Sequence, residues 1–265
     1  EGEIDVEDLI KEEQSVIALT HFGYIKRMPI DTYRSQKRGG KGITGIATRE
    51  EDFVKQIFTA STHDTILFFT NKGKLYKLRG YEVPEAGRMA RGTAIVNLLS
   101  LDAGEKVSAV IPIQNFAEGK YLLMATKKGL IKKTALAEYN SARKTGLQGI
   151  TLKEDDELIT VRLTDGEDNV VLVTRNGMCI TFDEKDVRPI GRVSQGVIGI
   201  RIDENDEVIG MESIISGGKA TLLAITENGF GKRTELDEYR VQIRGGKGVV
   251  TYKITPKTGK LVGVR

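Results

Sequence analysis

One pattern recurs five times along the 265 residues of this chain, and this repeat limits the possible folds more than any other feature. Each copy is an apolar run followed by Thr-x-x-Gly, at Thr20–Gly23, Thr70–Gly73, Thr126–Gly129, Thr174–Gly177 and Thr226–Gly229. The threonines are separated by 50, 56, 48 and 52 residues. A period near 50 residues indicates one structural unit that is built several times and packed against its own copies.

Each unit is expected to begin with a β-hairpin. The apolar runs have the length and composition of buried strands, and a glycine in the turn accepts the positive φ that tight hairpins require. A second glycine follows each threonine after 22, 22, 23, 22 and 22 residues, at Gly42, Gly92, Gly149, Gly196 and Gly248. A short β-strand after that glycine and another after an acidic turn would give four strands per unit, as in a propeller blade.

The predicted fold class is therefore all-β, with residues 14–265 forming a single domain of blade-like repeats. The blades are expected to start near residues 14, 64, 120, 169 and 220, after an acidic leader at 1–13 that acts as a linker or as a screening arm. Little helix is expected, and the one helix-like stretch, Glu51–Phe58, is short enough to be a strand with a turn. A sixth unit would begin near Thr255–Gly259, which leaves open a five-unit protein or a larger one with a further unit.

The net charge is more informative once the leader is separated from the repeats. Residues 1–13 hold seven acidic residues and one basic residue, so residues 14–265 hold 39 basic and 30 acidic ones, a net charge of about +9. This balance favours a polyanionic partner. No apolar run approaches the roughly 20 residues that cross a bilayer, so no membrane association and a cytoplasmic location are expected. The single cysteine, Cys179, is expected to be buried, and a zinc site is improbable.

The loop of the first unit contains the heptapeptide Gln36-Lys37-Arg38-Gly39-Gly40-Lys41-Gly42. Its glycines allow a tight turn with accessible N–H groups, and its three cations suit the binding of phosphate without reading of base sequence. Residues 40–45 also match G-x-G-x-x-G, but that motif needs a following helix, and a P-loop needs Ser or Thr after Gly-Lys. ATP binding in this chain is therefore not expected.

Basic residues recur in the corresponding loops and strand ends of the other units. In a ring of blades they would line up as a basic track along the rim, although each one alone would be read as an ordinary solvated charge. The candidate DNA-binding residues outside the heptapeptide are Lys77, Arg88, Arg91, Lys132, Lys133, Arg143, Lys144, Arg188, Arg192, Lys232, Arg233, Arg244 and Lys247. The last two lie in a second heptapeptide-like run, Gln242–Gly248, which is either another phosphate clamp or a trace of repeat ancestry.

The heptapeptide resembles the GyrA box of the C-terminal domain family of DNA gyrase A subunits, with Lys37 in place of an arginine. Residues 20–27, 81–86, 91–99 and 229–234 are also similar to that family. The resemblance implies a β-pinwheel, a usually six-bladed relative of the propeller whose blades exchange strands and whose rim wraps double-stranded DNA. The box is implied to be required for the wrapping that lets the whole gyrase introduce negative supercoils.

The resemblance also implies that this chain holds no catalytic residue, metal or cofactor. The cleavage tyrosine is implied to lie in the N-terminal part of gyrase A, and ATP and Mg²⁺ to be used elsewhere in a bacterial, nucleoid-associated holoenzyme with two copies each of the gyrase A and gyrase B polypeptides. Two alternatives stay open. One is the corresponding domain of topoisomerase IV, whose family usually has a degenerate box. The other is a protein-binding propeller of the WD-repeat kind, which the absence of tryptophan disfavours.

Overall fold

The structure is a computed structural model that describes residues 5–32, 38, 40, 51–141, 143 and 145–265. Each Thr-x-x-Gly segment forms the turn of a two-stranded antiparallel hairpin, as predicted. In the third hairpin, the Thr126 hydroxyl accepts a hydrogen bond from the amide of Leu130 at 3.1 Å. Gly129, which lies between them, has a φ of 92°. The motif therefore recurs because the hydroxyl closes the turn and glycine tolerates its backbone conformation.

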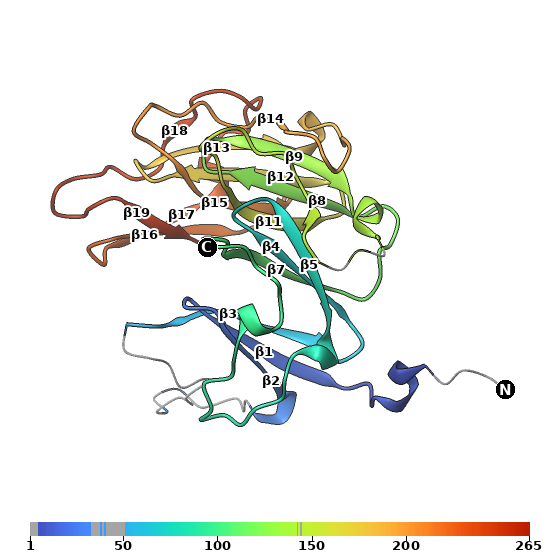
Figure 1. Cartoon of the computed structure of the whole chain (residues 1–265). Helices are drawn as coiled ribbons and strands as arrows, with labels where there is room; N and C mark the ends of the chain where they lie inside the picture. The colour runs from blue at the N-terminus through green and yellow to red at the C-terminus, as the bar shows by residue number, and fades with distance from the viewer. Residues whose placement is uncertain (1–4, 33–37, 39, 41–50, 142, 144) are drawn as a thin grey trace.

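Five antiparallel sheets follow one another in sequence order around a common axis (Figure 1). The predicted all-β, propeller-like fold is confirmed. The strands next to the axis are β3, β7, β11, β15 and β19, and β11 contacts both β7 and β15. From inner to outer edge, the sheets are β3(Val54–Ser61), β1(Gln14–Thr20), β2(Tyr24–Pro29), β6(Thr93–Ala94); β7(Val107–Ile113), β4(Thr65–Thr70), β5(Lys74–Arg79), β10(Leu147–Gln148); β11(Leu158–Thr164), β8(Tyr121–Thr126), β9(Leu130–Ala135), β14(Val197–Ile198); β15(Val208–Ile215), β12(Asp168–Thr174), β13(Met178–Asp183), β18(Val249–Val250); and β19(Leu261–Val264), β16(Thr221–Thr226), β17(Gly231–Glu235).

The outer strand of each four-stranded sheet is donated by the next repeat. Strand β6 belongs to the second repeat in sequence but pairs with β2 of the first, where Thr93 lies opposite Ile25. Strands β10, β14 and β18 make the same exchange with the second, third and fourth sheets. Consecutive blades are therefore joined by backbone hydrogen bonds as well as by side-chain packing, which is the strand exchange that the resemblance implied.

The glycine that precedes the exchanged strand was assigned wrongly in the third repeat. Gly146, with a φ of 62°, precedes β10, whereas Gly149 follows it. The amide of Gly149 donates to the carbonyl of Gly73 at 2.8 Å, and the amide of Gly199 in the fourth repeat donates to Gly129 in the same way at 2.9 Å. Gly149 is thus the counterpart of Gly199. The loop in the third repeat is shorter than the others by two residues, which the sequence spacing concealed.

The apolar core lies between consecutive sheets. Alternate residues of each first hairpin strand pack on the sheet before it and on the sheet after it, so Leu67 and Phe69 contact the third blade while Ile66 and Phe68 contact the first. Both faces of the strand are therefore buried, as its uninterrupted apolar sequence predicted. Cys179 is buried in the cluster between the fourth and fifth blades, where burial raises the pKa of its thiol to about 11.

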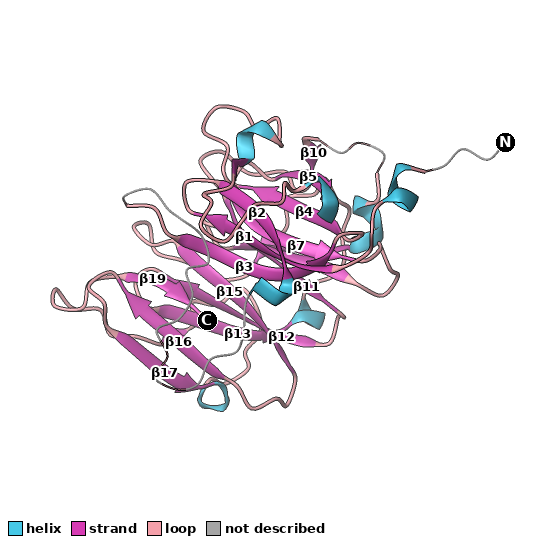
Figure 2. Cartoon of the chain, turned by 90° about the horizontal axis from the view of Figure 1, so that it is seen from below, coloured by secondary structure: helices cyan, strands magenta, loops and turns pink. Residues whose placement is uncertain are grey.

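Helix in the described part of the chain is limited to 3₁₀ turns of three or four residues, which lie in the connections and not among the strands (Figure 2). Glu51–Phe58 contributes to a turn and to β3, as expected. None of these helices has the length and apolar character to span a bilayer. The turns are η1(Val6–Leu9), η2(Ile30–Thr32), η3(Gly80–Glu82), η4(Ile95–Asn97), η5(Leu136–Tyr139), η6(Glu184–Asp186) and η7(Leu236–Glu238).

The described part of the acidic leader is attached to the turn between β3 and β4. The Thr62 hydroxyl donates to the carbonyl of Lys11 at 2.8 Å, and His63 Nε2 lies 2.7 Å from the carbonyl of Ile10. The Glu7 carboxylate pairs with the guanidinium of Arg79. Residues 7–13 therefore run along the first and second blades, so this part of the leader is held against the domain.

Candidate nucleic-acid interface

The segment before each exchanged strand runs along the outer edge of the preceding blade. We call these segments the rim loops, and the described ones comprise residues 84–92, 188–196 and 240–248 together with the described residues of 140–146. Parallel bridges between Arg27 and Glu85, Lys133 and Pro189, and Thr181 and Val241 place three rim loops beside the hairpin of the repeat before. Each rim loop thus covers the joint between two blades on the outside of the domain.

Three rim loops carry an arginine four residues before the glycine of the exchanged strand. These arginines are Arg88, Arg192 and Arg244, and Arg38 has the same offset from Gly42 in the sequence. Arg88 is exposed, and Arg192 and Arg244 are half-buried. Arg91 and Lys247, which directly precede the glycine, are exposed or half-exposed, and the Arg91 guanidinium lies 5.5 Å from the ring centroid of Tyr24. The rim loops therefore present cations at matching places on successive blades.

Two of these arginines also connect neighbouring rim segments. Arg244 donates from Nη1 to the carbonyl of Ile198 and from Nε to the carbonyl of Asp186, both at 3.0 Å. Arg192 donates in the corresponding way to the carbonyl of Gln148. Because a guanidinium has five N–H donors, these contacts leave donors available for an anion. The successive rim segments are thus linked side by side along the outside of the domain.

The strand-end lysines in the predicted set do not belong to this surface. Lys132 is 0 % exposed, and its Nζ donates to the carbonyls of Gly149 and Arg192. Lys77 and Lys133 are also buried, and their ammonium groups donate to the carbonyls of Ser141 at 2.9 Å and Glu184 at 3.0 Å. Their prediction as DNA-binding residues was wrong, because an ammonium group held by carbonyls in the interior is not accessible to DNA.

The other predicted residues differ in position. Arg143 and Arg188 are exposed in rim loops, with Arg143 Nε donating to the carbonyl of Thr145 at 2.8 Å. Lys232 and Arg233 are exposed in β17, the outermost described strand of the fifth sheet. Of the heptapeptide, Arg38 and Gly40 are exposed. The remaining predicted residues lie outside the described part of the chain, namely Gln36, Lys37, Gly39, Lys41, Gly42 and Lys144.

Sequence reasoning missed Lys26. Its Nζ donates to the carbonyls of Gly87, Arg88 and Ala90 in the rim loop of the second repeat, and the side chain is 0 % exposed. Lys26 stands three residues after its hairpin glycine, the same offset as Lys132 from Gly129. That shared offset was the available signal, but nothing in the sequence distinguished a lysine that points inward from one that points outward.

Burial of Lys132 has a measurable consequence for stability. Burial lowers the pKa of Lys132 from 10.5 to about 7. The unfolded chain therefore binds a proton more readily between these values, and stability contributed by this group rises with pH across that window. Between about pH 7 and pH 8.5 we expect a gain of about 1 kcal/mol, or roughly 2–4 °C in Tm. Calorimetry should show a smaller rise for Lys132→Met; an equal rise would contradict this assignment.

The hairpin end of the domain is an unsuitable surface for an anionic ligand. Lys127 pairs with Glu207 of the next blade at 3.5 Å, and Arg175 pairs with Glu227 at 3.6 Å. Lys127 also lies 3.8 Å from Glu157. The acidic turns that the sequence showed are thus used in ion pairs between blades, so cations and carboxylates largely neutralise one another here.

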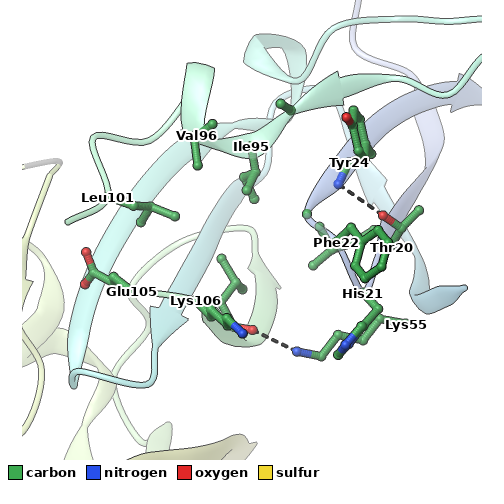
Figure 3. A pocket seen from close by; sticks show the side chains of 14 residues that line it. Thr20, His21, Phe22, Tyr24, Lys55, Ile95, Val96, Leu101, Glu105 and Lys106 are labelled. Carbon is green, nitrogen blue, oxygen red and sulfur yellow. Dashed lines mark hydrogen bonds between the residues drawn. The ribbon is translucent and has the colours of Figure 1, made fainter. Parts of the chain in front are cut away.

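A cavity of about 510 Å³ lies between the first hairpin turn and the second blade (Figure 3). Its titratable groups already have partners: Glu105 accepts hydrogen bonds from Tyr76 and Thr70 at 2.7 Å, and Lys55 Nζ donates to the carbonyl of Val107 at 2.8 Å. Among the described residues, no cluster of His, Cys, Asp and Glu is arranged to hold a metal ion. The exposed rim cations therefore remain the best-supported binding surface.

Comparison with known proteins agrees with this geometry. A family model described as the DNA gyrase C-terminal domain, beta-propeller, matches the chain five times, at residues 14–61, 64–114, 120–165, 168–215 and 220–265. The DNA gyrase A protein of Clostridium acetobutylicum is 57% identical over the whole chain, which corresponds to 32% of that protein. The DNA gyrase A protein of Staphylococcus epidermidis is 48% identical over 98% of the chain and 29% of its own length. The chain thus spans about a third of the curated relatives it matches.

Solved structures give the same result. The C-terminal domain of DNA topoisomerase IV superposes with a TM-score of 0.80 at 30% identity, covering 97% of this chain and 78% of the other. The C-terminal domain of DNA gyrase A superposes with a TM-score of 0.77 at 27% identity, covering 96% and 82%. Because the gyrase family model matches every repeat and the sequence relatives are gyrase A proteins, this chain belongs to the DNA gyrase C-terminal domain family.

Proposed function

We propose that this domain binds duplex DNA along its rim loops and bends it around the outside of the blades, without catalysing a reaction. The observation that carries the proposal is the matched position of Arg88, Arg192 and Arg244 on three rim loops that follow one another around the domain. Arginines at a surface can bind phosphate with two parallel hydrogen bonds. Matched cations on a curved surface hold a DNA backbone in a curved path.

The energetics favour many contacts over a few strong ones. Bending 20–30 base pairs by 40–90° costs on the order of 1–6 kcal/mol, and dispersed phosphate contacts must offset this cost. Each phosphate that a cation neutralises releases counterions, so such binding is steeply dependent on salt and largely independent of sequence. The net charge of about +9 over residues 14–265 has the sign this mechanism requires.

In the whole protein we propose that this domain is the C-terminal part of gyrase A, working with the N-terminal part of gyrase A and with gyrase B. DNA bent around the rim would then be presented to the cleavage site for supercoiling. The 57% identity to a gyrase A protein favours gyrase over topoisomerase IV. Membership of the gyrase family likewise disfavours a protein-binding propeller.

The test is to measure binding of this chain to duplexes of about 20, 60 and 120 base pairs across a salt series. We expect affinity per duplex to rise with length beyond what the number of sites alone gives, and to fall steeply with salt. A bending assay with dyes on both ends of the middle duplex should show the ends approaching on binding. Salt-insensitive binding, or binding that leaves the DNA straight, would overturn the proposal.

A further inference from the structure

The joints between blades contain buried cations that bind the rim loops from inside. Lys26 lies on β2 of the first blade, and its Nζ donates to the carbonyls of Gly87, Arg88 and Ala90 at 3.0, 2.7 and 3.0 Å. All three acceptors belong to the rim loop of the second repeat. One of them is the backbone of Arg88, whose side chain is exposed.

Lys132 occupies the same place on β9 of the third blade. Its Nζ donates to the carbonyl of Gly149 at 2.6 Å, to the Tyr139 hydroxyl at 3.2 Å and to the carbonyl of Arg192. Arg192 is the matched arginine of the fourth repeat. In both joints the ammonium group therefore binds the backbone of the same rim arginine, although the two rim loops differ in sequence.

The next residue along each of these strands reinforces the contact. Arg27 Nε donates to the carbonyl of Val83 at 3.1 Å, and Lys133 Nζ donates to that of Glu184 at 3.0 Å. Lys77 on β5 of the second blade donates to the carbonyl of Ser141 in the third repeat at 2.9 Å. In each case the donor belongs to one repeat and the acceptor to the next.

Such an arrangement specifies the loop conformation closely. Removing an ammonium group from water is unfavourable, and burial accordingly lowers the pKa of both Lys26 and Lys132. Only a conformation that brings several acceptors to the ammonium group offsets this cost. Because the carbonyls turn inward to meet the lysine, the arginine side chain of the same residue is directed outward.

We propose that Lys26 and Lys132 are positioning residues for DNA binding, each fixing the rim loop of the next repeat so that its arginine faces outward. The proposal rests on the proposed function for the identity of the ligand. The lysines themselves do not touch DNA. They set the geometry of Arg88 and Arg192, so they act on affinity through those two side chains.

The first test is hydrogen exchange on Lys26→Met and Lys132→Met. Methionine has a similar shape but no donor, so we expect faster exchange in residues 86–91 for K26M and in 188–194 for K132M, with other peptides unchanged. The variants Lys26→Gln and Lys132→Gln, which keep amide donors, should restore part of the protection and cover the case in which a methionine variant folds poorly. Unchanged exchange in the rim loop would overturn the proposal.

The second test is a double-mutant cycle in DNA binding. We expect K26M to weaken binding to a duplex of about 120 base pairs by roughly 3- to 10-fold, because up to two phosphate contacts depend on this loop. In an Arg88→Ala, Arg91→Ala background K26M should have little further effect, because its action passes through those arginines. A purely structural lysine would weaken binding equally in both backgrounds, and that result would overturn the proposal.

A matched control separates this inference from the proposed function. Lys232 has the same offset from its hairpin glycine as Lys26, but it is exposed and its Nζ lies 3.5 Å from its acceptor, the carbonyl of Thr251. Lys232→Met should leave hydrogen exchange of the rim loops unchanged. If Arg88→Ala, Arg91→Ala leaves DNA binding intact, the proposed function fails, whereas the exchange data still decide whether Lys26 orders the loop.

Discussion

Replacing Arg88, Arg192 and Arg244 together with alanine is expected to weaken binding to a long duplex by on the order of 100-fold at about 0.1 M salt. The three arginines have the same offset in three rim loops, so one DNA path can contact all of them. The slope of log K against log salt should become shallower by about 3, because roughly one counterion is released for each phosphate contact. Fluorescence anisotropy across a salt series measures both quantities.

The matched control removes the same charge from the other surface. Lys72, Lys106 and Lys128 are exposed at the hairpin end, so their triple alanine variant also lowers the net charge by three. We expect that variant to bind within a few-fold of the unchanged chain, with nearly the same salt slope. Equal losses in the two triple variants would mean that net charge matters and the path along the rim does not.

Gly177→Ala is expected to destabilise the domain by about 3 kcal/mol or more, a fall of roughly 6–12 °C in Tm. Gly177 closes the fourth hairpin with a φ of 86°, and a Cβ there would lie 2.1 Å from the carbonyl oxygen of Tyr252. The carbonyl of Gly177 also accepts hydrogen bonds from Thr251 and Tyr252. The substitution therefore forces apart the fourth blade and the strand that the fifth repeat donates to it.

Gly104→Ala provides the comparison for this effect. Gly104 has a similar φ of 74°, but a Cβ at this position would meet no atom within 4 Å. Only the backbone conformation is then unfavourable, and we expect a loss of about 1 kcal/mol, or roughly 2–4 °C in Tm. Calorimetry of both variants distinguishes the two contributions. A similar loss in both would show that the close approach to Tyr252 is relaxed without cost.

The repeat pattern predicted the hairpins because their turns depend on local chemistry. A threonine hydroxyl and a glycine with positive φ must stand three residues apart wherever the turn occurs, so the sequence shows them directly. The exchanged strands were harder to locate, since only two residues of each strand pair with the preceding blade. In the third repeat this led to Gly149 in place of Gly146.

The basic residues show the limit of the same reasoning. Lys132 and Arg88 recur in comparable ways along the sequence, yet one ammonium group is enclosed by carbonyls and the other side chain is exposed. A periodic cation satisfies both patterns, because inter-blade joints and rim positions repeat with the same period. Only the three-dimensional path of the rim loop, which depends on the neighbouring repeat, decides which cations reach the surface.

The exchange of β6, β10, β14 and β18 also determines how the domain can carry load. Bent DNA acts as a spring that pulls outward on the loops holding it. Each rim loop continues into a strand that is hydrogen-bonded to the previous blade, while its own hairpin stands in the next one. A pull on one loop is thus divided between two neighbouring sheets, like tension between overlapping roof tiles, so no single blade has to resist the recoil of the DNA alone.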